Sequence, residues 1–167
     1  LPAGVTALRD LPSVAVLGPP AWAAGAPGTV VWHSATSGLT WELWRTDHYV
    51  PLRALTLVDA DRGWAVGDRG VIWLTDDGGR NWQLQSSPVV CRLESVCFVD
   101  VRDGWIVGGW SHPYTHRSTG VVLRTTDGGQ RWERIPRVSL PALRSVKFFD
   151  LRGGWAVGDA SATYSAG

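Results

Sequence analysis

The 167-residue sequence has no methionine, two cysteines and one lysine, and it has no long hydrophobic run. Without a methionine, Leu1 is not a translation start, so we expect a processed protein, an excised piece or the ordered part of a longer chain. No apolar stretch approaches the roughly 18 residues that cross a bilayer. Hydrophobic residues still make up 44% of the chain, which is a globular composition. The sequence therefore predicts a globular domain without direct membrane insertion.

Charges of the two signs are nearly balanced, with a formal net charge of +1. This balance gives no reason to expect a nucleic acid partner, because such proteins carry a strongly basic surface. Every basic residue except Lys147 is an arginine, and arginine favours planar, bidentate contacts with carboxylates.

The two cysteines, Cys91 and Cys97, do not have the CxxC spacing of metal and redox sites. They are expected to be unpaired, partly buried thiols. A disulfide between them requires Cys91 to fold back over a strand. We expect no cofactor and no metal.

What the sequence does contain is a repeat. LRALTLVDADRGWAVGD begins at Leu52, LESVCFVDVRDGWIVGG at Leu93 and LRSVKFFDLRGGWAVGD at Leu143, and a shortened copy, LPSVAVLGPPAWAAG, begins at Leu11. An aspartate, a glycine and a tryptophan mark the register: Asp59, Asp100 and Asp150; Gly63, Gly104 and Gly154; Trp22, Trp64, Trp105 and Trp155. Repeats of this length are typical of solenoids and propellers.

Each copy predicts four short strands. The first two cover the repeated segment, the third is predicted over 70–74 and 120–124, and the fourth over 82–85 and 132–135. No segment has a sustained helical period. Four short antiparallel strands in a unit of about 40 to 45 residues are the signature of a blade in an all-β β-propeller.

The copies set the expected domain organisation. We predict blades at 11–48, 52–87 and 93–138, an incomplete blade at 143–167, and an N-terminal segment or closing strand at 1–10. About three and a half blades do not close a ring, and an open propeller exposes sheet edges. The chain is therefore expected to be part of a seven-bladed ring, or two copies associate to complete one.

A second motif, TDDGGRNW at 75–82, returns as TTDGGQRW at 125–132 and, degenerately, as SATSGLTW at 34–41. It falls at the predicted hairpin between the third and fourth strands. Its aspartate is expected to accept turn amides, its glycine to supply positive φ, its hydroxyl to tie the strand end and its tryptophan to pack beside the turn. The predicted structural residues are Thr75, Asp77, Gly79, Trp82, Thr125, Asp127, Gly129, Trp132, Ser34, Gly38 and Trp41.

The pattern S/T-x-D-x-G-x-x-W resembles the Asp box, or bacterial neuraminidase repeat. With GWAVG one strand earlier, the unit resembles the photosystem II stability/assembly factor family over residues 11–167. The resemblance implies a seven-bladed propeller in the periplasm or thylakoid lumen. It also implies a non-enzymatic scaffold that binds a protein partner and assembles or stabilises a membrane photosynthetic complex. Thr36 stands where the box has its aspartate, so the first turn is expected to be looser.

Asp-box propellers also include sialidases, so a glycan-binding or glycoside-hydrolysing propeller is the alternative. Residues 134–136 repeat the Arg-Ile-Pro motif of those enzymes, but they follow a box, whereas the sialidase motif precedes the first one. Catalysis also requires a paired tyrosine and glutamate, and the sequence shows no recognisable pair among Tyr49, Tyr114, Tyr164, Glu42, Glu94 and Glu133. We therefore expect no enzymatic activity.

Eleven tryptophans are present, and nine hold repeated positions that are expected in the core: Trp22, Trp32, Trp41, Trp64, Trp73, Trp82, Trp105, Trp132 and Trp155. Trp44 and Trp110 fall outside the pattern. Trp110 opens an insertion in the third copy, WSHPYTHRSTG, where aromatic and cationic residues are typical of a protein interface. The alternatives are that Trp110 covers the base of its own loop, and that two loop histidines bind a metal without a third ligand. The candidate partner-binding residues are Trp110, His112, Tyr114, His116 and Arg117.

Overall fold

The structure is a computed structural model that describes residues 13–16, 21–25, 30–34, 36, 42–45, 50–112, 114, 117–136 and 140–159. Within these ranges every regular element is a β-strand, apart from one 3-10 turn, η2 (Asp68–Gly70). Before residue 50, side chains are described only for His33, Ser34 and Thr36. The predicted segment 1–10 lies outside the described residues. No helix in the described part of the chain has the length and hydropathy of a bilayer span.

The strands form four antiparallel sheets, and within each sheet the strands lie in chain order. The first sheet contains β1 (Ser13–Val16), β2 (Ala21–Gly25), β3 (Val30–Ser34) and β4 (Glu42–Arg45). The second contains β5 (Leu52–Leu57), β6 (Gly63–Gly67), β7 (Ile72–Thr75) and β8 (Gln83–Leu84). The third contains β9 (Arg92–Phe98), β10 (Gly104–Ser111), β11 (Ser118–Thr125) and β12 (Glu133–Arg134). The fourth contains β13 (Leu143–Phe148) and β14 (Gly154–Gly158).

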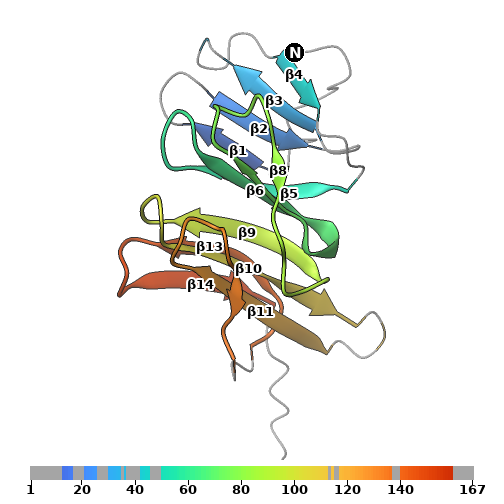
Figure 1. The fold of residues 1–167 in the computed structure, drawn as a ribbon. Helices are drawn as coiled ribbons and strands as arrows, with labels where there is room; N and C mark the ends of the chain where they lie inside the picture. The colour runs from blue at the N-terminus through green and yellow to red at the C-terminus, as the bar shows by residue number, and fades with distance from the viewer. Residues whose placement is uncertain are drawn as a thin grey trace, which may run out of the picture.

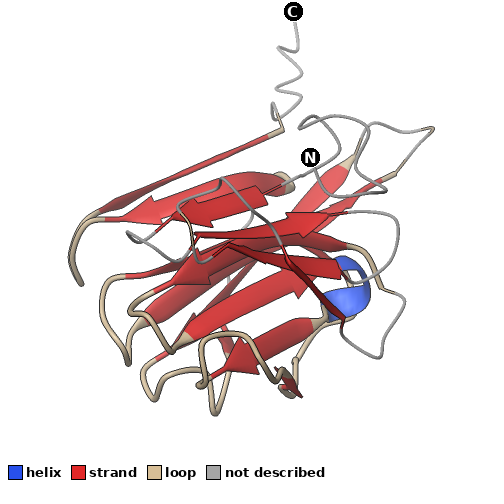
Figure 2. Ribbon diagram, turned by 90° about the horizontal axis from the view of Figure 1, so that it is seen from above, coloured by secondary structure: helices blue, strands red, loops and turns tan. Residues whose placement is uncertain are grey.

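The sheets follow one another through the molecule in chain order (Figure 1). The first strand of each sheet contacts the first strand of the next, β1 with β5, β5 with β9 and β9 with β13. Figure 2 shows the same sheets from above, with the strands of successive sheets packed as layers. This is the arrangement of successive blades in a β-propeller. The prediction of an all-β propeller with about three and a half blades is confirmed, and the seven-bladed ring stays a prediction.

Aromatic stacking joins the second sheet to the third and the third sheet to the fourth. Trp64 on β6 is fully buried and stacks on Phe98 of β9, with ring centroids 3.7 Å apart and planes at 16°. Trp105 on β10 stacks in the same way on Phe148 of β13, at 3.9 Å and 9°. Trp132 adds an edge-on contact to Phe98 at 5.8 Å. The repeated tryptophan therefore packs between sheets, where its large apolar area leaves water.

Polar side chains on β9 also bind β13 across the seam between the third and fourth sheets. The backbone N–H of Val146 donates to Ser95 Oγ at 3.2 Å, and that of Phe148 donates to the buried thiol of Cys97 at 3.3 Å. Cys91, the residue before β9, is half-buried and also free. Ser95 and Cys97 therefore satisfy backbone donors between two sheets that share no ladder.

The third and fourth strands differ from the predicted ranges. The third strand of the second sheet begins at Ile72, because Arg69 (φ 58°) and Gly70 (φ 74°) adopt left-handed conformations in the η2 turn. The fourth strands, β8 and β12, contain only two residues each. Both are exposed outer-edge strands, and a short outer edge offers few unpaired backbone groups to another chain.

The expected burial of the repeated tryptophans is correct for Trp64, Trp73, Trp105 and Trp132 and wrong for Trp155. Trp155 is 74% exposed, since no described element packs over the face of β14 that corresponds to the buried faces of β6 and β10. Trp82 is only half-buried. Nothing is described of the side chains at the other repeated positions, Trp22, Trp32 and Trp41.

Candidate functional site

The two complete Asp boxes are closed by their own side chains. In the second sheet, Thr75 Oγ1 accepts the Gly79 N–H at 2.8 Å and donates to Asp77 Oδ1 at 3.0 Å. Asp77 in turn accepts the backbone N–H of Asn81 at 2.9 Å and its side-chain amide at 2.6 Å. Gly79 has a φ of 83°, which a side chain at this position would disfavour. The threonine hydroxyl and the carboxylate thus replace the backbone partners that a tight turn lacks.

The third sheet repeats this geometry. Thr125 Oγ1 accepts the Gly129 N–H at 2.9 Å and donates to Asp127 Oδ1 at 2.8 Å, and Asp127 accepts the Arg131 N–H at 3.0 Å. Gly129 has a φ of 81°, and a Cβ there would lie 2.6 Å from Trp64 Nε1 of the previous sheet. This box is therefore part of the packing between two blades as well as a turn.

Hydrogen bonding lowers the pKa of both box aspartates. For Asp127, the backbone N–H of Arg131 is the largest cause. For Asp77, burial is the largest single influence and acts upwards, but the hydrogen bonds from Asn81 and Thr75 together outweigh it and lower the pKa. Both groups are stabilised as carboxylates, which suits an acceptor in a turn and does not suit a proton-donating acid.

The degenerate first box is described only at two residues. Ser34 is buried, and its Oγ accepts the Thr36 N–H at 3.3 Å and lies 3.4 Å from Thr36 Oγ1. Gly38 and Trp41 lie outside the described residues.

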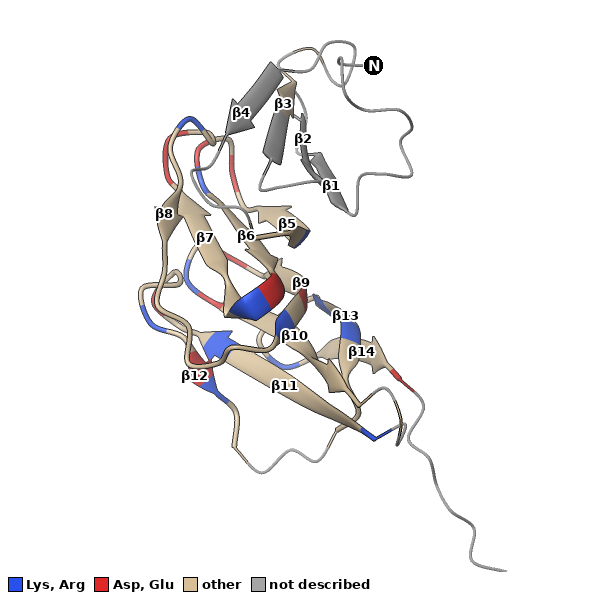
Figure 3. Ribbon diagram, turned by 90° about the vertical axis from the view of Figure 1, so that its right-hand side faces the viewer, with Lys and Arg blue, Asp and Glu red and all other residues tan. Residues whose placement is uncertain are grey.

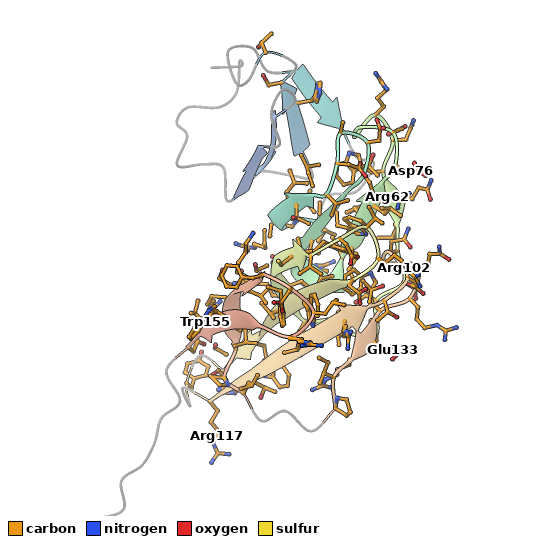
Figure 4. The ribbon with its side chains drawn as sticks, turned by 90° about the vertical axis from the view of Figure 1, so that its left-hand side faces the viewer. Arg62, Asp76, Arg102, Arg117, Glu133 and Trp155 are labelled. Atoms are coloured by element: carbon orange, nitrogen blue, oxygen red, sulfur yellow. The ribbon has the colours of Figure 1, made fainter. Side chains whose placement is uncertain are left out.

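The candidate partner-binding residues lie at the opposite end of the strands from the Asp boxes. The insertion lengthens the β10–β11 hairpin, which pairs Trp110 with Thr119 and Ser111 with Ser118. Trp110 therefore lies within a strand, although the sequence places it at the opening of a loop. Figure 4 shows Arg117 at the tip of this hairpin, away from Arg62, Asp76 and Arg102 at the box end.

The side chains of this hairpin face solvent. Trp110 is 55% exposed and Tyr114 is 87% exposed, and the rings of His112 and Tyr114 meet edge-on at 6.0 Å. Arg117 is exposed as well, and its carbonyl accepts the His112 N–H at 2.8 Å. His116 lies outside the described residues, and the described residues contain no group of three or more metal-ligating side chains.

Trp110 forms one wall of a surface groove of about 590 Å³ at the seam between the second and third sheets. The segment that connects these sheets, 87–91, also lines the groove. The floor belongs to the interblade core, because Val121 is in the buried cluster, and Val89 and Cys91 pack against it. The residues that line the groove are Ser87, Pro88, Val89, Val90, Cys91, Trp110, Val121 and Arg134.

The chemistry of the groove is apolar with one cation. Val90 is 88% exposed beside Trp110, and no aspartate or glutamate is in the lining. Burial raises the pKa of the Cys91 thiol, so that Cys91 is neutral near pH 7 and adds apolar surface. Arg134 supplies the single formal charge. The sequence did not predict this groove, because it depends on the path of the connecting segment.

A chain of ion pairs crosses the second, third and fourth sheets at the same end as the Trp110 hairpin. Figure 3 shows basic and acidic positions gathered around η2, β9 and β13. Arg53 binds Asp68 through two hydrogen bonds, at 2.9 and 3.2 Å, and this contact is the largest cause of the lowered pKa of Asp68. Arg92 of the third sheet approaches the same carboxylate at 3.1 Å. Glu94 then lies 3.7 Å from Arg92 and 2.6 Å from Arg144 of the fourth sheet.

The chain of ion pairs ends at the base of the hairpin. Arg144 binds Asp159 at 3.0 and 3.3 Å, and Asp159 accepts the Ser111 hydroxyl at 2.7 Å. The Ser111 hydrogen bond is the largest cause of the lowered pKa of Asp159. The residue next to Trp110 is therefore tied to the fourth sheet. One signal in the sequence was available: Arg53 precedes Asp68, and Arg144 precedes Asp159, by the same number of residues.

Two residues of the sialidase alternative, Glu94 and Tyr114, contact other residues in the structure. Glu94 lies within the ion pairs, Glu133 and Arg134 form the short strand β12, and Tyr114 contacts His112. Tyr49 and Tyr164 lie outside the described residues, and nothing is described of the Glu42 side chain. The structure describes no contact between a tyrosine and a glutamate.

A family model, photosynthesis system II assembly factor YCF48, matches residues 47–145, which is more than half of the chain. The chain belongs to this family. The match includes the second and third sheets, both complete Asp boxes and the Trp110 hairpin. The resemblance expected from the repeat is thus confirmed.

Two solved structures are also similar to the chain. One is YCF48 bound to D1 peptide, with 16% identity over 89% of this chain and 74% of that chain, and a TM-score of 0.46. The other is YCF48 from Cyanidioschyzon merolae, with 18% identity over 86% of this chain and 75% of that chain, and a TM-score of 0.38. No curated protein matches the chain. Membership of the family rests on the family model.

Proposed function

We propose that the chain is a non-enzymatic propeller scaffold that binds a protein partner during assembly of a membrane photosynthetic complex. The observation that carries this proposal is the match to the assembly-factor family over residues 47–145. The matched segment contains the exposed Trp110 hairpin and the groove beside it. A catalytic role has less support, because the box aspartates are held as carboxylates in turns.

The partner contacts the end of the blades that carries the hairpin. Trp110 offers an exposed aromatic surface, which is typical of interface anchors, and Tyr114, His112, His116 and Arg117 follow it. The ion pairs from Arg53 to Asp159 hold this end of three sheets together. A rigid base reduces the conformational entropy that binding would cost.

The proposal also covers the compartment in which the protein acts and the way in which the propeller ring is completed. The family match favours a location in the periplasm or thylakoid lumen, where such a factor meets the complex from its non-cytoplasmic side. Blades are proposed at 11–48, 52–87 and 93–138, with 143–167 as the beginning of the next and 1–10 as a preceding segment or closing strand. A seven-bladed ring is proposed for the closed state, formed within one protein or by association of two copies.

A capture experiment tests the function. The chain is immobilised and incubated with solubilised photosynthetic membranes, and retained proteins are identified by mass spectrometry. We expect subunits of a photosynthetic complex to be retained, and the D1 peptide of the solved YCF48 complex is the first defined probe. The control replaces 112–117 with Asn-Gly, which closes a two-residue hairpin between Ser111 and Ser118. Equal capture by this variant would remove the hairpin from the interface, and reproducible glycan binding or sialidase turnover would contradict the scaffold function.

A further inference from the structure

The groove beside Trp110 has the chemistry of a site for an extended peptide. Its floor is already part of the core, so it is a fixed feature and does not need to open. Ser87 Oγ accepts the Val89 N–H at 3.3 Å and donates to the Val89 carbonyl at 3.0 Å, which holds the connecting segment in one conformation. A preformed wall limits the ordering that a ligand must impose.

The connecting segment also presents free backbone groups. Within the described residues, no hydrogen bond joins the N–H or the carbonyl of Val90 to another group, and the Val90 side chain is 88% exposed. An extended chain laid along this segment gains main-chain hydrogen bonds, as in other cases where a peptide adds to a sheet edge. Trp110 lines the same groove and offers an apolar contact to a side chain of the same peptide.

Arg134 favours a ligand with a negative charge. It is exposed, makes no ion pair with another described residue, and is the only charged group in the lining. A guanidinium favours a carboxylate, with which it forms charge-assisted hydrogen bonds. Trp110 pairs with Thr119 and Arg134 pairs with Leu123, four residues further along β11. Since alternate side chains of an extended peptide share a face, an apolar residue and an acidic residue four positions apart reach Trp110 and Arg134 together.

We infer that the groove lined by Trp110 and the 87–91 segment binds an extended stretch of a partner protein with an apolar side chain at one position and an aspartate or glutamate four positions away. The inference rests on the proposed function and names the part of the partner that this groove recognises. The apolar side chain packs between Trp110 and Val90, and the acidic side chain binds Arg134.

Two capped peptides test the inference on the full chain. Acetyl-ALAAAEA-amide carries leucine and glutamate at the required spacing of four positions, and acetyl-ALAAAQA-amide replaces the charge with an amide. Each is titrated into ¹⁵N-labelled protein while amide shifts are followed by NMR. We expect shifts at Val90, Cys91 and the Trp110 indole, with the glutamate peptide bound about two- to fivefold more tightly, which is the range of an exposed ion pair. Acetyl-ALAAAQA with a free C-terminal carboxylate is expected to bind like the amide form.

Variants assign the two contacts. Arg134→Gln should abolish the preference for glutamate, Trp110→Ala should weaken both peptides, and Arg152→Gln, an exposed arginine on the β13–β14 turn, should change neither. Equal affinities for the two capped peptides, shifts outside the groove, or a gain only with the free carboxylate would overturn the inference. If any of these results occurs while the capture experiment still retains photosynthetic proteins, only the groove inference fails. The proposed function then stands, because capture does not depend on this groove alone.

Discussion

Trp64 of the second sheet stacks on Phe98 of the third, with their ring centroids 3.7 Å apart. The same contact joins Trp105 to Phe148 one sheet later. The repeated tryptophan is thus a link between neighbours, and its contribution to stability depends on the first strand of the following blade. Leu57 occupies the place of Phe98 in the second sheet, so the repeat itself supplies a smaller apolar residue for comparison.

Truncation of this link is expected to destabilise the protein. Phe98→Ala should lower the free energy of unfolding by about 3 kcal/mol, because it removes the stacked ring and leaves a cavity between sheets. Phe98→Leu should lower it by less than half of that amount. Urea unfolding followed by tryptophan fluorescence measures both. Phe149→Ala is the control, since Phe149 is 68% exposed and should change the stability little. Similar losses for Phe98→Ala and Phe149→Ala would contradict the interblade link.

The box threonine is expected to matter more than the exposed threonine beside it. Thr125→Val keeps the side-chain shape but removes the acceptor of the buried Gly129 N–H, at an expected cost of about 1–3 kcal/mol. Thr126→Val is the matched control, because Thr126 is exposed. The same unfolding measurement compares the two. An equal effect of both substitutions would mean that the hydroxyl does not hold the turn.

Acid is expected to destabilise the fold through the aspartates whose pKa is lowered. Asp68, Asp77, Asp100, Asp127 and Asp159 all have a folded pKa below the ordinary value of 3.8. An aspartate whose pKa is lower in the folded state than in the unfolded state stabilises the fold at pH values above its unfolded pKa. That contribution is lost as the pH falls through its folded pKa. Unfolding midpoints should therefore be flat above about pH 5 and fall steadily below about pH 4.

A variant in which both box aspartates are neutral provides the control for this pH dependence. Asp77→Asn with Asp127→Asn removes two of the titrating carboxylates, so the double variant should be less stable at pH 7 and should lose less stability on acidification. A double variant with the same acid slope as the wild type would show that the box aspartates do not carry the linkage.

The tie between Ser111 and Asp159 is expected to hold the Trp110 hairpin against the fourth sheet. Ser111→Ala should leave the unfolding free energy nearly unchanged, since the contact is exposed, but should speed hydrogen exchange at the β10–β11 hairpin end. Thr119→Ala is the control, because within the described residues no side-chain contact ties Thr119 to the fourth sheet. Unchanged exchange at Trp110 in Ser111→Ala would show that the hydroxyl does not position the hairpin.

The sequence predicted the sheets because each blade is built from local signals: an alternating strand, an aspartate turn and a box. Those signals repeat, so errors at one copy are corrected by the others. The prediction failed where burial depends on a neighbour, as at Trp155, whose face no described element covers. It also predicted fourth strands of four residues, whereas β8 and β12 contain two residues each. The Trp110 groove and the ion pairs from Arg53 to Asp159 arise between segments far apart in the chain, and single-copy patterns do not encode such contacts.

The central claim is that the hairpin end of the blades binds a protein partner from a photosynthetic complex. The most direct test measures binding of solubilised photosystem II complexes to the immobilised chain, for the wild type, Trp110→Ala and Thr126→Val. The account predicts saturable binding by the wild type and Thr126→Val, and an affinity at least about tenfold weaker for Trp110→Ala, the effect of losing an aromatic anchor. Absence of binding by the wild type, or equal affinities for all three proteins, would contradict it.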